Sequence, residues 1–209
     1  MYAVVGPAFR VTTAWGREVG LKMCIPKNHL QQLSGQVVWL TGLPCSGKTT
    51  IAQELRRQCQ EHSISSFILD GDELRSGVNS DLGFDEASRT ENVRRVAELA
   101  KLMAASEIAV FVALISPRRS MRSMAKEIIG SERFHEIFVS CSAETCAQRD
   151  VKGHWRKANT GQMSNFTGVQ SGYENPEHAN LILKTDELPL EECCRQIAEL
   201  VTAKATVQA

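Results

Sequence analysis

One short motif restricts the possible folds of this chain more than any other feature. Residues 42–49 read Gly-Leu-Pro-Cys-Ser-Gly-Lys-Thr and fit the pattern G-x-x-x-x-G-K-[ST]. An apolar run at 36–41 precedes the motif and an amphipathic stretch at 48–60 follows it, so it joins a predicted strand to a predicted helix. In this setting the glycines allow backbone N–H groups to turn toward phosphate oxygens. The motif therefore predicts a nucleoside-triphosphate site rather than a chance strand–turn–helix.

Each part of this P-loop (residues 42–49) has an expected role. We expect Lys48 to reach the outer phosphates of ATP and the Thr49 hydroxyl to ligate Mg²⁺. The residues that we expect to hold ATP are Gly42, Leu43, Pro44, Cys45, Ser46, Gly47, Lys48, Thr49 and Thr50.

Apolar runs and amphipathic stretches alternate from residue 36 onward. The predicted strands are 36–41, 66–70, 108–115, 136–140 and 180–184, and the predicted helices are 48–60, 88–105, 118–129 and 189–202. Such alternation predicts an α/β fold, with a five-stranded parallel sheet flanked by helices.

The chain is expected to form one domain with an amino-terminal arm. Residues 1–34 show weak periodicity and form the predicted arm, with a short helix near 27–33 and Met23 as an alternative start. Residues 35–205 form the predicted domain, in which a polar, glycine-rich stretch at about 150–168 is a predicted lid loop.

Charge and composition exclude several classes of protein. Lys and Arg number 24 and Asp and Glu also number 24, so a broad electrostatic surface for nucleic acid is not expected. No run of eighteen apolar residues occurs, so no membrane span is expected. The seven cysteines form no C-x-x-C pair, which favours reduced thiols in a cytoplasmic protein over a disulfide framework or a zinc module.

Two carboxylates lie where the second predicted strand ends, in the sequence Asp70-Gly71-Asp72. Ligands of open parallel sheets bind at the carboxyl ends of the strands. These carboxylates could serve Mg²⁺ and a hydroxyl nucleophile. Alternatively, Asp72 caps a short helix that begins at Glu73, and the sequence does not separate these two interpretations.

Further candidate residues lie on the predicted helix at 88–105 and just before it. Arg89 and Asn92 share one helix face, while Arg75 and Phe84 lie in the preceding segment. Arginines beside an aromatic ring suit a ligand that carries both an anionic group and a flat base. The alternative is a solvated helix face.

Ser116 follows the longest apolar strand, in the sequence Ser116-Pro117-Arg118. A serine N-cap followed by proline is an ordinary helix start, and a serine at a strand's carboxyl end can also face a ligand. The segment 149–157 concentrates cations and suits a lid that closes over phosphates, although a solvated surface loop is the alternative.

Taken together, these motifs resemble the adenylyl-sulfate kinase family over roughly residues 36–203. The matching segments are GLPCSGKTT at 42–50, LDGDELRSGVNSDLGF at 69–84, RTENVRRVAELAK at 89–101, LISPRR at 114–119, RDVKGHWRKANTG at 149–161 and NFTGVQSGYE at 165–174. The ordered combination is far more specific than the P-loop alone. The resemblance implies a P-loop nucleoside-kinase-like fold. It also implies that ATP and adenosine 5′-phosphosulfate are converted to ADP and 3′-phosphoadenosine 5′-phosphosulfate.

The resemblance also assigns roles by position. Asp72 matches the residue that acts on the 3′-hydroxyl, with Asp70 beside it near Mg²⁺, and Lys48 and Ser116 complete the expected catalytic set. The expected substrate contacts are Asp70, Asp72, Arg75, Phe84, Arg89, Asn92, Ile115, Ser116, Lys152 and Phe166, with Phe84 and Phe166 on either side of the adenine. Ser116 also matches a serine regarded in the family as a phosphoserine intermediate, but we expect direct transfer.

The chain departs from the family pattern at Pro44 and Cys45 in the P-loop, and at His154 and Trp155 in the lid. The resemblance further implies a homodimer that receives its substrate from a separate ATP sulfurylase. A P-loop kinase of another small hydroxyl acceptor, such as a sugar acid or a nucleoside, is the main alternative. A nucleotide-binding switch without transfer chemistry is the other.

Overall fold

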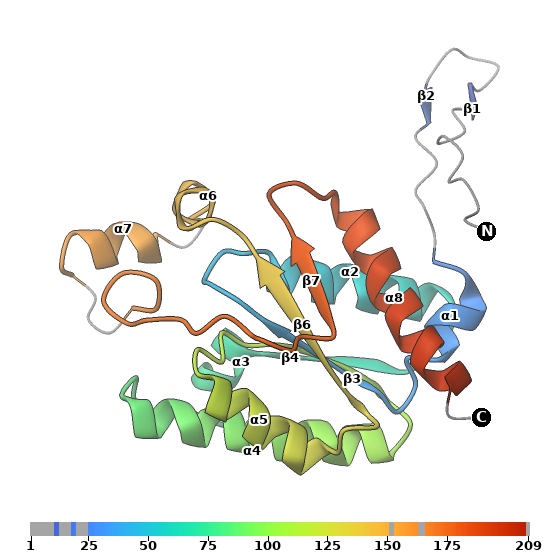
Figure 1. Cartoon of the computed structure of the whole chain (residues 1–209), viewed down its shortest axis with the longest axis horizontal. Coiled ribbons are helices and arrows are strands. Elements are labelled where there is room, and N and C mark those ends of the chain that lie inside the picture. The colour runs from blue at the N-terminus through green and yellow to red at the C-terminus, as the bar shows by residue number, and fades with distance from the viewer. Residues whose placement is uncertain (1–10, 13–17, 20–24, 151–152, 163–165, 208–209) are drawn as a thin grey trace.

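The structure is a computed structural model that describes residues 11–12, 18–19, 25–150, 153–162 and 166–207 (Figure 1). Most of the predicted arm, with Met23, lies outside these residues. So does the predicted substrate contact Lys152.

A five-stranded, all-parallel sheet forms the centre of the molecule, which confirms the predicted fold class. Its strands are β3 (Val37–Thr41), β4 (Ser66–Asp70), β5 (Ala109–Ala113), β6 (Phe134–Ser140) and β7 (Leu181–Lys184). They lie in the order β4-β5-β3-β6-β7, and every neighbouring pair is parallel. The predicted strand 108–115 is shorter in the structure, because the chain turns away toward Ser116, which has a φ of +43°.

The long helices form where the periodicity predicts them. They are α2 (Lys48–Glu61), α4 (Glu86–Ala105), α5 (Arg119–Ile129) and α8 (Leu190–Val207), together with the short α1 (Lys27–Gln31). Three further short helices occur among the described residues: α3 (Gly71–Ser76), which the sequence offered only as an alternative beginning at Glu73, and α6 (Ala143–Gln148) and α7 (His154–Asn159), which were not predicted. A small antiparallel pair, β1 (Val11–Thr12) with β2 (Glu18–Val19), precedes α1.

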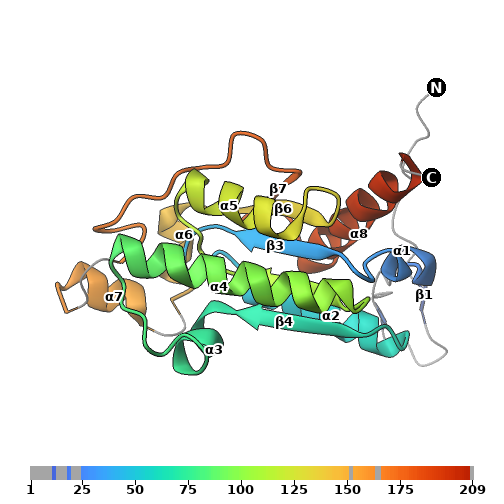
Figure 2. The same cartoon turned by 90° about the horizontal axis from the view of Figure 1, so that it is seen from below.

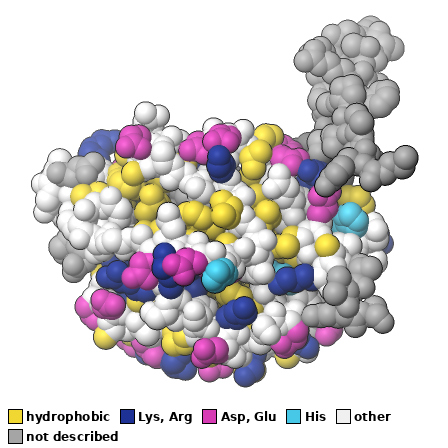
Figure 3. Space-filling model, in the orientation of Figure 1, with side chains coloured by type: hydrophobic (Ala, Val, Ile, Leu, Met, Phe, Trp, Pro, Cys, Tyr) yellow, Lys and Arg dark blue, Asp and Glu magenta, His cyan; other side chains and the backbone are white. Residues whose placement is uncertain are grey.

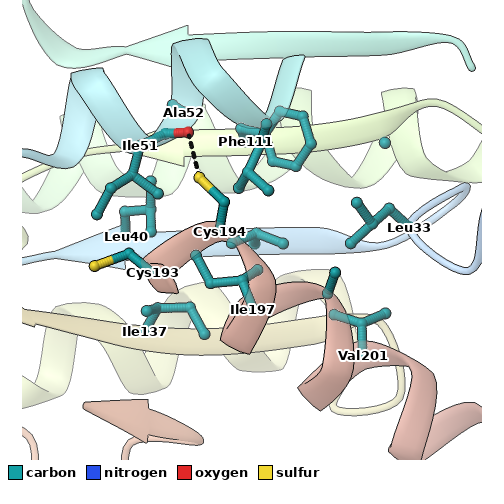
Figure 4. Close-up of a cluster of buried hydrophobic side chains, with 14 of the residues drawn as sticks. Leu33, Leu40, Ile51, Ala52, Phe111, Ile137, Cys193, Cys194, Ile197 and Val201 are labelled. Atoms are coloured by element: carbon teal, nitrogen blue, oxygen red, sulfur yellow. Dashed lines mark hydrogen bonds between the residues drawn. The ribbon is translucent and has the colours of Figure 1, made fainter. Parts of the chain in front are cut away.

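Helices cover both faces of the sheet, and alternate residues of β3 show how. Val38 and Leu40 belong to the buried cluster shared with α2 and α8, which Figure 4 shows around Ile51, Phe111 and Ile197. Trp39, between them in sequence, packs into a second cluster with α4 and α5 on the opposite face (Figure 2). The central strand is therefore buried on both sides, as expected for a parallel sheet.

Three apolar residues between positions 25 and 33 pack into the core, although the sequence placed them in the arm. Ile25, Leu30 and Leu33 are at most 1% exposed and belong to the cluster with α2 and α8. The backbone N–H of Ile25 also donates to Gln58 Oε1 at 3.0 Å. These residues extend the globular core toward the amino terminus.

The cysteines, the surface charges and the helices can each be compared with what the composition led us to expect. The six cysteines within the described segments are free thiols. The visible face in Figure 3 carries charges of both signs interspersed, without a broad region of one sign. Within the described part of the chain, no helix combines the length and apolar character that a bilayer crossing requires.

Candidate active site

The predicted site residues meet at one edge of the sheet. The P-loop follows β3, Asp70 ends β4, and Ser116 lies three residues beyond the end of β5. Because β5 pairs with both β3 and β4, the carboxyl ends of these three strands lie side by side. The short helices α3, α6 and α7 gather at this same end, opposite α1 (Figures 1 and 2).

Two glycines give the P-loop its shape. Gly42 has a φ of +151°, and a Cβ there would lie 2.4 Å from the backbone oxygen of Val139, so no side chain fits. Gly47 has a φ of +103° and is the N-cap of α2. Cys45 takes a left-handed φ of +65° without being glycine, a conformation that costs about 1 kcal/mol. The loop thus delivers the first turn of α2 to the edge of the sheet, where its N–H groups can face an anion.

Lys48 folds back onto the P-loop. Its Nζ donates to the backbone oxygens of Gly42 at 3.0 Å and Leu43 at 2.6 Å. Burial lowers the pKa of Lys48 to about 8, and neighbouring acidic groups offset only part of this effect. A bound triphosphate would give this cation better partners than backbone oxygens.

The Asp70 carboxylate connects the P-loop to α3. Its Oδ2 accepts from the Thr49 hydroxyl at 2.7 Å, and its Oδ1 accepts from the Asp72 backbone N–H at 2.9 Å. Asp70 is therefore the N-cap, and α3 begins at Gly71. The alternative in which Asp72 caps a helix beginning at Glu73 is wrong, because Asp70 already accepts the N–H of Asp72. Asp72 is left on the first turn of α3 with an exposed side chain.

Arg75, Phe84 and Arg89 form a cationic and aromatic cluster beside α3 and α4. The Arg75 guanidinium lies 4.4 Å from the Phe84 ring centroid and donates to Gly83 O at 2.7 Å. Arg89 donates to Phe84 O at 2.8 Å. Burial, followed by the charge of Arg89, lowers the pKa of Arg75, so two cations share this corner. Such a corner favours an anionic ligand.

Arg89 also connects this cluster to the far end of the lid. Its Nη1 donates to Thr167 Oγ1 at 2.6 Å, which places Phe166 on the same side of the site as Phe84. Phe84 is 61% exposed, whereas Phe166 is 8% exposed and packs edge-on against Trp155 at 5.3 Å between ring centroids. Phe84 therefore presents its ring to solvent, whereas the Phe166 ring is fixed by packing.

Trp155 is a functional candidate that the sequence suggested only as a departure from the family pattern. It lies on α7, and its indole N–H donates to the backbone oxygen of Pro44 at 3.2 Å. Its ring covers Gly168, where a Cβ would lie 2.7 Å from the indole carbon Cη2. The predicted lid thus contains a helix that contacts the P-loop directly.

Ser116 is buried and its side chain is occupied. Its Oγ accepts from the Trp39 indole N–H at 3.1 Å, and its backbone oxygen accepts from Arg122 at 2.7 Å. Arg122 is 2% exposed and forms an ion pair with Glu136 at 2.7 Å, without the alignment of a hydrogen bond. The helix-start interpretation of Ser116 is wrong, because α5 begins at Arg119 and its N-cap is Arg118.

The remaining predicted contacts lie close by. The backbone oxygen of Ile115 accepts from Thr41 Oγ1 at 2.7 Å. Asn92 is buried on α4 and pairs with Asn79, a residue that the sequence did not single out. A cavity of about 450 Å³ lies on the β6 side of the P-loop, between Leu43, Phe138 and Tyr173. Among the described residues, Leu43 is the single predicted site residue that lines this cavity, so the cavity does not coincide with the cluster of Arg75, Phe84 and Arg89.

Comparison with known proteins places these features in a family. The model of the family described as adenylylsulphate kinase matches residues 34–184. An adenylyl-sulfate kinase of Bacteroides thetaiotaomicron is 46% identical over 177 residues, which cover 83% of this chain and 88% of that protein. A relative from Bacillus pumilus with the same name is 41% identical over 184 residues, or 87% of this chain and 93% of that protein.

Solved structures agree with the sequence matches. An APS kinase of Mycobacterium tuberculosis, solved in complex with AMPPNP and APS, is 37% identical with a TM-score of 0.77. The match covers 81% of this chain and 98% of that one. A gluconokinase from Sinorhizobium meliloti is 18% identical with a TM-score of 0.58, covering 84% of this chain and 96% of that one. At this identity the likeness shows the fold alone.

Proposed function

The chain belongs to the adenylylsulphate kinase family, and we propose that it transfers the γ-phosphate of ATP to the 3′-hydroxyl of adenosine 5′-phosphosulfate. The products are ADP and 3′-phosphoadenosine 5′-phosphosulfate. One observation carries the proposal. A P-loop and a separate corner with two arginines and an exposed aromatic ring meet on either side of Asp72 at one sheet edge.

The P-loop side would hold ATP. Backbone N–H groups of residues 42–49 and the first turn of α2 face the phosphates, while Lys48 leaves the oxygens of Gly42 and Leu43 to follow the transferring phosphoryl group. The family's solved relative contains an ATP analogue, which supports this assignment for a nucleotide.

A magnesium ion fits the oxygen pair beside the P-loop. Mg²⁺ prefers oxygen ligands and is held in kinases by few carboxylates and the phosphates themselves. The Thr49 hydroxyl and the Asp70 carboxylate, 2.7 Å apart, supply such oxygens. When bound, the ion would neutralise charge on the β- and γ-phosphates.

The acceptor side would hold adenosine 5′-phosphosulfate. Arg75 and Arg89 match its anionic group with paired donors, Phe84 and Phe166 provide apolar rings for its adenine, and Asn92 adds a polar contact. Asp72, exposed on the first turn of α3, would orient the 3′-hydroxyl and accept its proton. Ile115 and Lys152 are further proposed contacts, the latter outside the described residues.

We propose direct transfer, with Ser116 in a positioning role. Its hydroxyl oxygen is occupied by the Trp39 N–H, and the residue is 3% exposed, so it is poorly placed to attack a phosphate. In this path the phosphoryl group passes from ATP directly to the acceptor oxygen and is never bonded to the enzyme.

A panel of acceptors tests the proposed reaction. ADP release is measured with ATP, Mg²⁺ and either adenosine 5′-phosphosulfate, adenosine 5′-phosphate, gluconate or a nucleoside. We expect turnover with the phosphosulfate to exceed every other acceptor by at least a hundredfold, the range that buried polar recognition provides. Equal or greater turnover with gluconate or a nucleoside would reject the proposal, and removal of Mg²⁺ with a chelator should abolish the activity.

Three further assignments rest on the family resemblance. We propose that the chain is cytoplasmic, that it forms a homodimer, and that a separate ATP sulfurylase supplies its acceptor. Light scattering of the purified chain tests the homodimer, because a monomeric mass at micromolar concentration would contradict it.

A further inference from the structure

Asn79 lies between α3 and α4 and has none of the roles assigned above. It is 0% exposed, although its neighbour Val78 is 64% exposed and Ser80 is also exposed. Burying an asparagine amide costs free energy unless the amide finds hydrogen-bond partners. The contacts of Asn79 therefore indicate what its burial achieves.

Asn79 joins the two helices that carry the acceptor residues. Its backbone N–H donates to Leu74 O, in the last turn of α3, at 2.8 Å. Its side-chain Nδ2 donates to Asn92 Oδ1 on α4 at 2.9 Å. Asp72 and Arg75 lie on α3, and Arg89 and Asn92 lie on α4. One buried residue thus links the two helices that carry these proposed acceptor contacts, through its backbone to α3 and through its side chain to α4.

The contact also fixes which way the Asn92 amide faces. Because Asn92 Oδ1 already accepts from Asn79, the hydrogen-bonding atom left over is Asn92 Nδ2. This Nδ2 has no partner among the described residues and is not enclosed, whereas Asn79 Oδ1 is enclosed and unpaired. A lone buried carbonyl oxygen is tolerated better than a lone buried N–H, which favours this orientation of the pair over the reverse.

We propose that Asn79 is a positioning residue for the acceptor. It turns the Asn92 amide so that its N–H₂ faces outward from α4, on the helix face that also carries Arg89 one turn earlier. Asn92 then donates to an oxygen or ring nitrogen of the acceptor nucleotide. The inference rests on the proposed function, since it requires that the acceptor binds against α4.

Isosteric and truncating variants test this role by calorimetric binding and by steady-state kinetics. Asn79→Asp keeps the shape but replaces the donor with an oxygen, so the Asn92 amide must turn and present its carbonyl to the acceptor. We expect the Kd and KM for adenosine 5′-phosphosulfate to rise about tenfold, the effect of one lost hydrogen bond. The KM for ATP should change less than about twofold, because the P-loop is not involved. Ser80→Asp places the same charge on the exposed neighbour and serves as the control.

A double-mutant cycle separates positioning from a general structural role. Asn79→Ala should raise the acceptor KM about tenfold in the wild-type chain but less than about twofold when Asn92→Ala is already present. Asn79→Ser, which keeps a hydroxyl donor, should recover part of the affinity.

Three results would overturn the proposal. They are equal losses for ATP and acceptor, equal effects of Asn79→Ala with and without Asn92→Ala, and an unchanged acceptor Kd in Asn79→Asp. If the truncating variant Asn79→Ala fails to fold, the isosteric Asn79→Asp and the hydroxyl-bearing Asn79→Ser still decide the question. Wild-type turnover of adenosine 5′-phosphosulfate tests the proposed function independently, so the two failures are distinguishable.

Discussion

Lys48 is buried against backbone oxygens, an environment that suits its positive charge less well than bound phosphates would. Burial lowers its pKa from the usual 10.5 to about 8, so between these pH values the unfolded chain binds more protons than the folded chain. The free energy of unfolding therefore rises with pH across that window. Below pH 8 the ammonium is charged in both the folded and the unfolded chain, so the full free-energy cost of burying it lowers the stability. A triphosphate would stabilise the charged form and raise the pKa again.

The first prediction removes this charge with Lys48→Met. We expect turnover to fall on the order of 10²-fold or more, because the transferring phosphoryl group loses a placed cation. The ligand-free chain should gain on the order of 1–3 kcal/mol in unfolding free energy at pH 7. Denaturant unfolding measures this, with Lys101→Met on the exposed face of α4 as the control. A less stable Lys48→Met chain would contradict the argument.

The second prediction uses the same residue in proton linkage. ATP binding near pH 8.5 should take up protons, since bound phosphates raise the pKa of Lys48. Calorimetry in two buffers of different ionisation enthalpy measures the uptake, which should disappear in Lys48→Met. Equal proton uptake by the variant would assign it to another group, such as the phosphates of ATP.

The third prediction concerns Ser116. In Ser116→Ala the buried Trp39 N–H loses its acceptor, so we expect a loss of about 1–2 kcal/mol in unfolding free energy. Turnover should remain measurable, and no label from γ-labelled ATP should stay on the enzyme. A phosphoserine that forms and decays at the catalytic rate would show that transfer is covalent after all. Ser120→Ala, exposed on α5, controls for the loss of a hydroxyl.

At the scale of elements, α7 connects the two sides of the site. Trp155 donates to the P-loop at Pro44, contacts Phe166 and covers Gly168. The two carbonyls preceding that of Pro44, those of Gly42 and Leu43, accept hydrogen bonds from Lys48. The position of α7 is thus tied to the same stretch of backbone that ATP would engage.

The fourth prediction separates this contact from backbone strain by comparing two glycines. Gly161 and Gly168 have φ values of +74° and +99°, so alanine is strained at both. Nothing lies within 4 Å of a Cβ at Gly161, whereas one at Gly168 would lie 2.7 Å from Trp155. Gly168→Ala should therefore displace Trp155, shift its fluorescence to the red, and raise KM for both substrates on the order of tenfold to a hundredfold. Gly161→Ala should do neither, and equal effects of the two changes would leave strain as the sole cause.

At the scale of the whole molecule, local patterns account for what the sequence predicted. The P-loop and the long helices α2, α4, α5 and α8 have signals within one continuous segment, so the sheet and its flanking helices followed from spacing. The helices α3, α6 and α7 have six residues each, too few turns for a periodic pattern to emerge. The contact from Trp155 to Pro44 spans 111 residues. In the sequence Asn79 is indistinguishable from an ordinary loop asparagine, and only the structure shows its contact with Asn92. Such contacts depend on tertiary packing and leave no local sequence signal.

The last prediction concerns where the folded unit begins. The sequence placed the boundary after residue 34, but Ile25, Leu30 and Leu33 are buried among the side chains of α2 and α8. We therefore propose a boundary near residue 25. A chain lacking residues 1–24 should keep its midpoint of thermal unfolding within a few degrees. A chain lacking residues 1–34 should lose several times the 2–5 kcal/mol typical of a single Leu→Ala change in a core, and should fold poorly. Leu30→Ala in the full chain is the matched point change, with an expected loss of about 2–5 kcal/mol. Equal stability of the two truncated chains would show that the segment 25–34 contributes nothing to the core, and the boundary would return to residue 35.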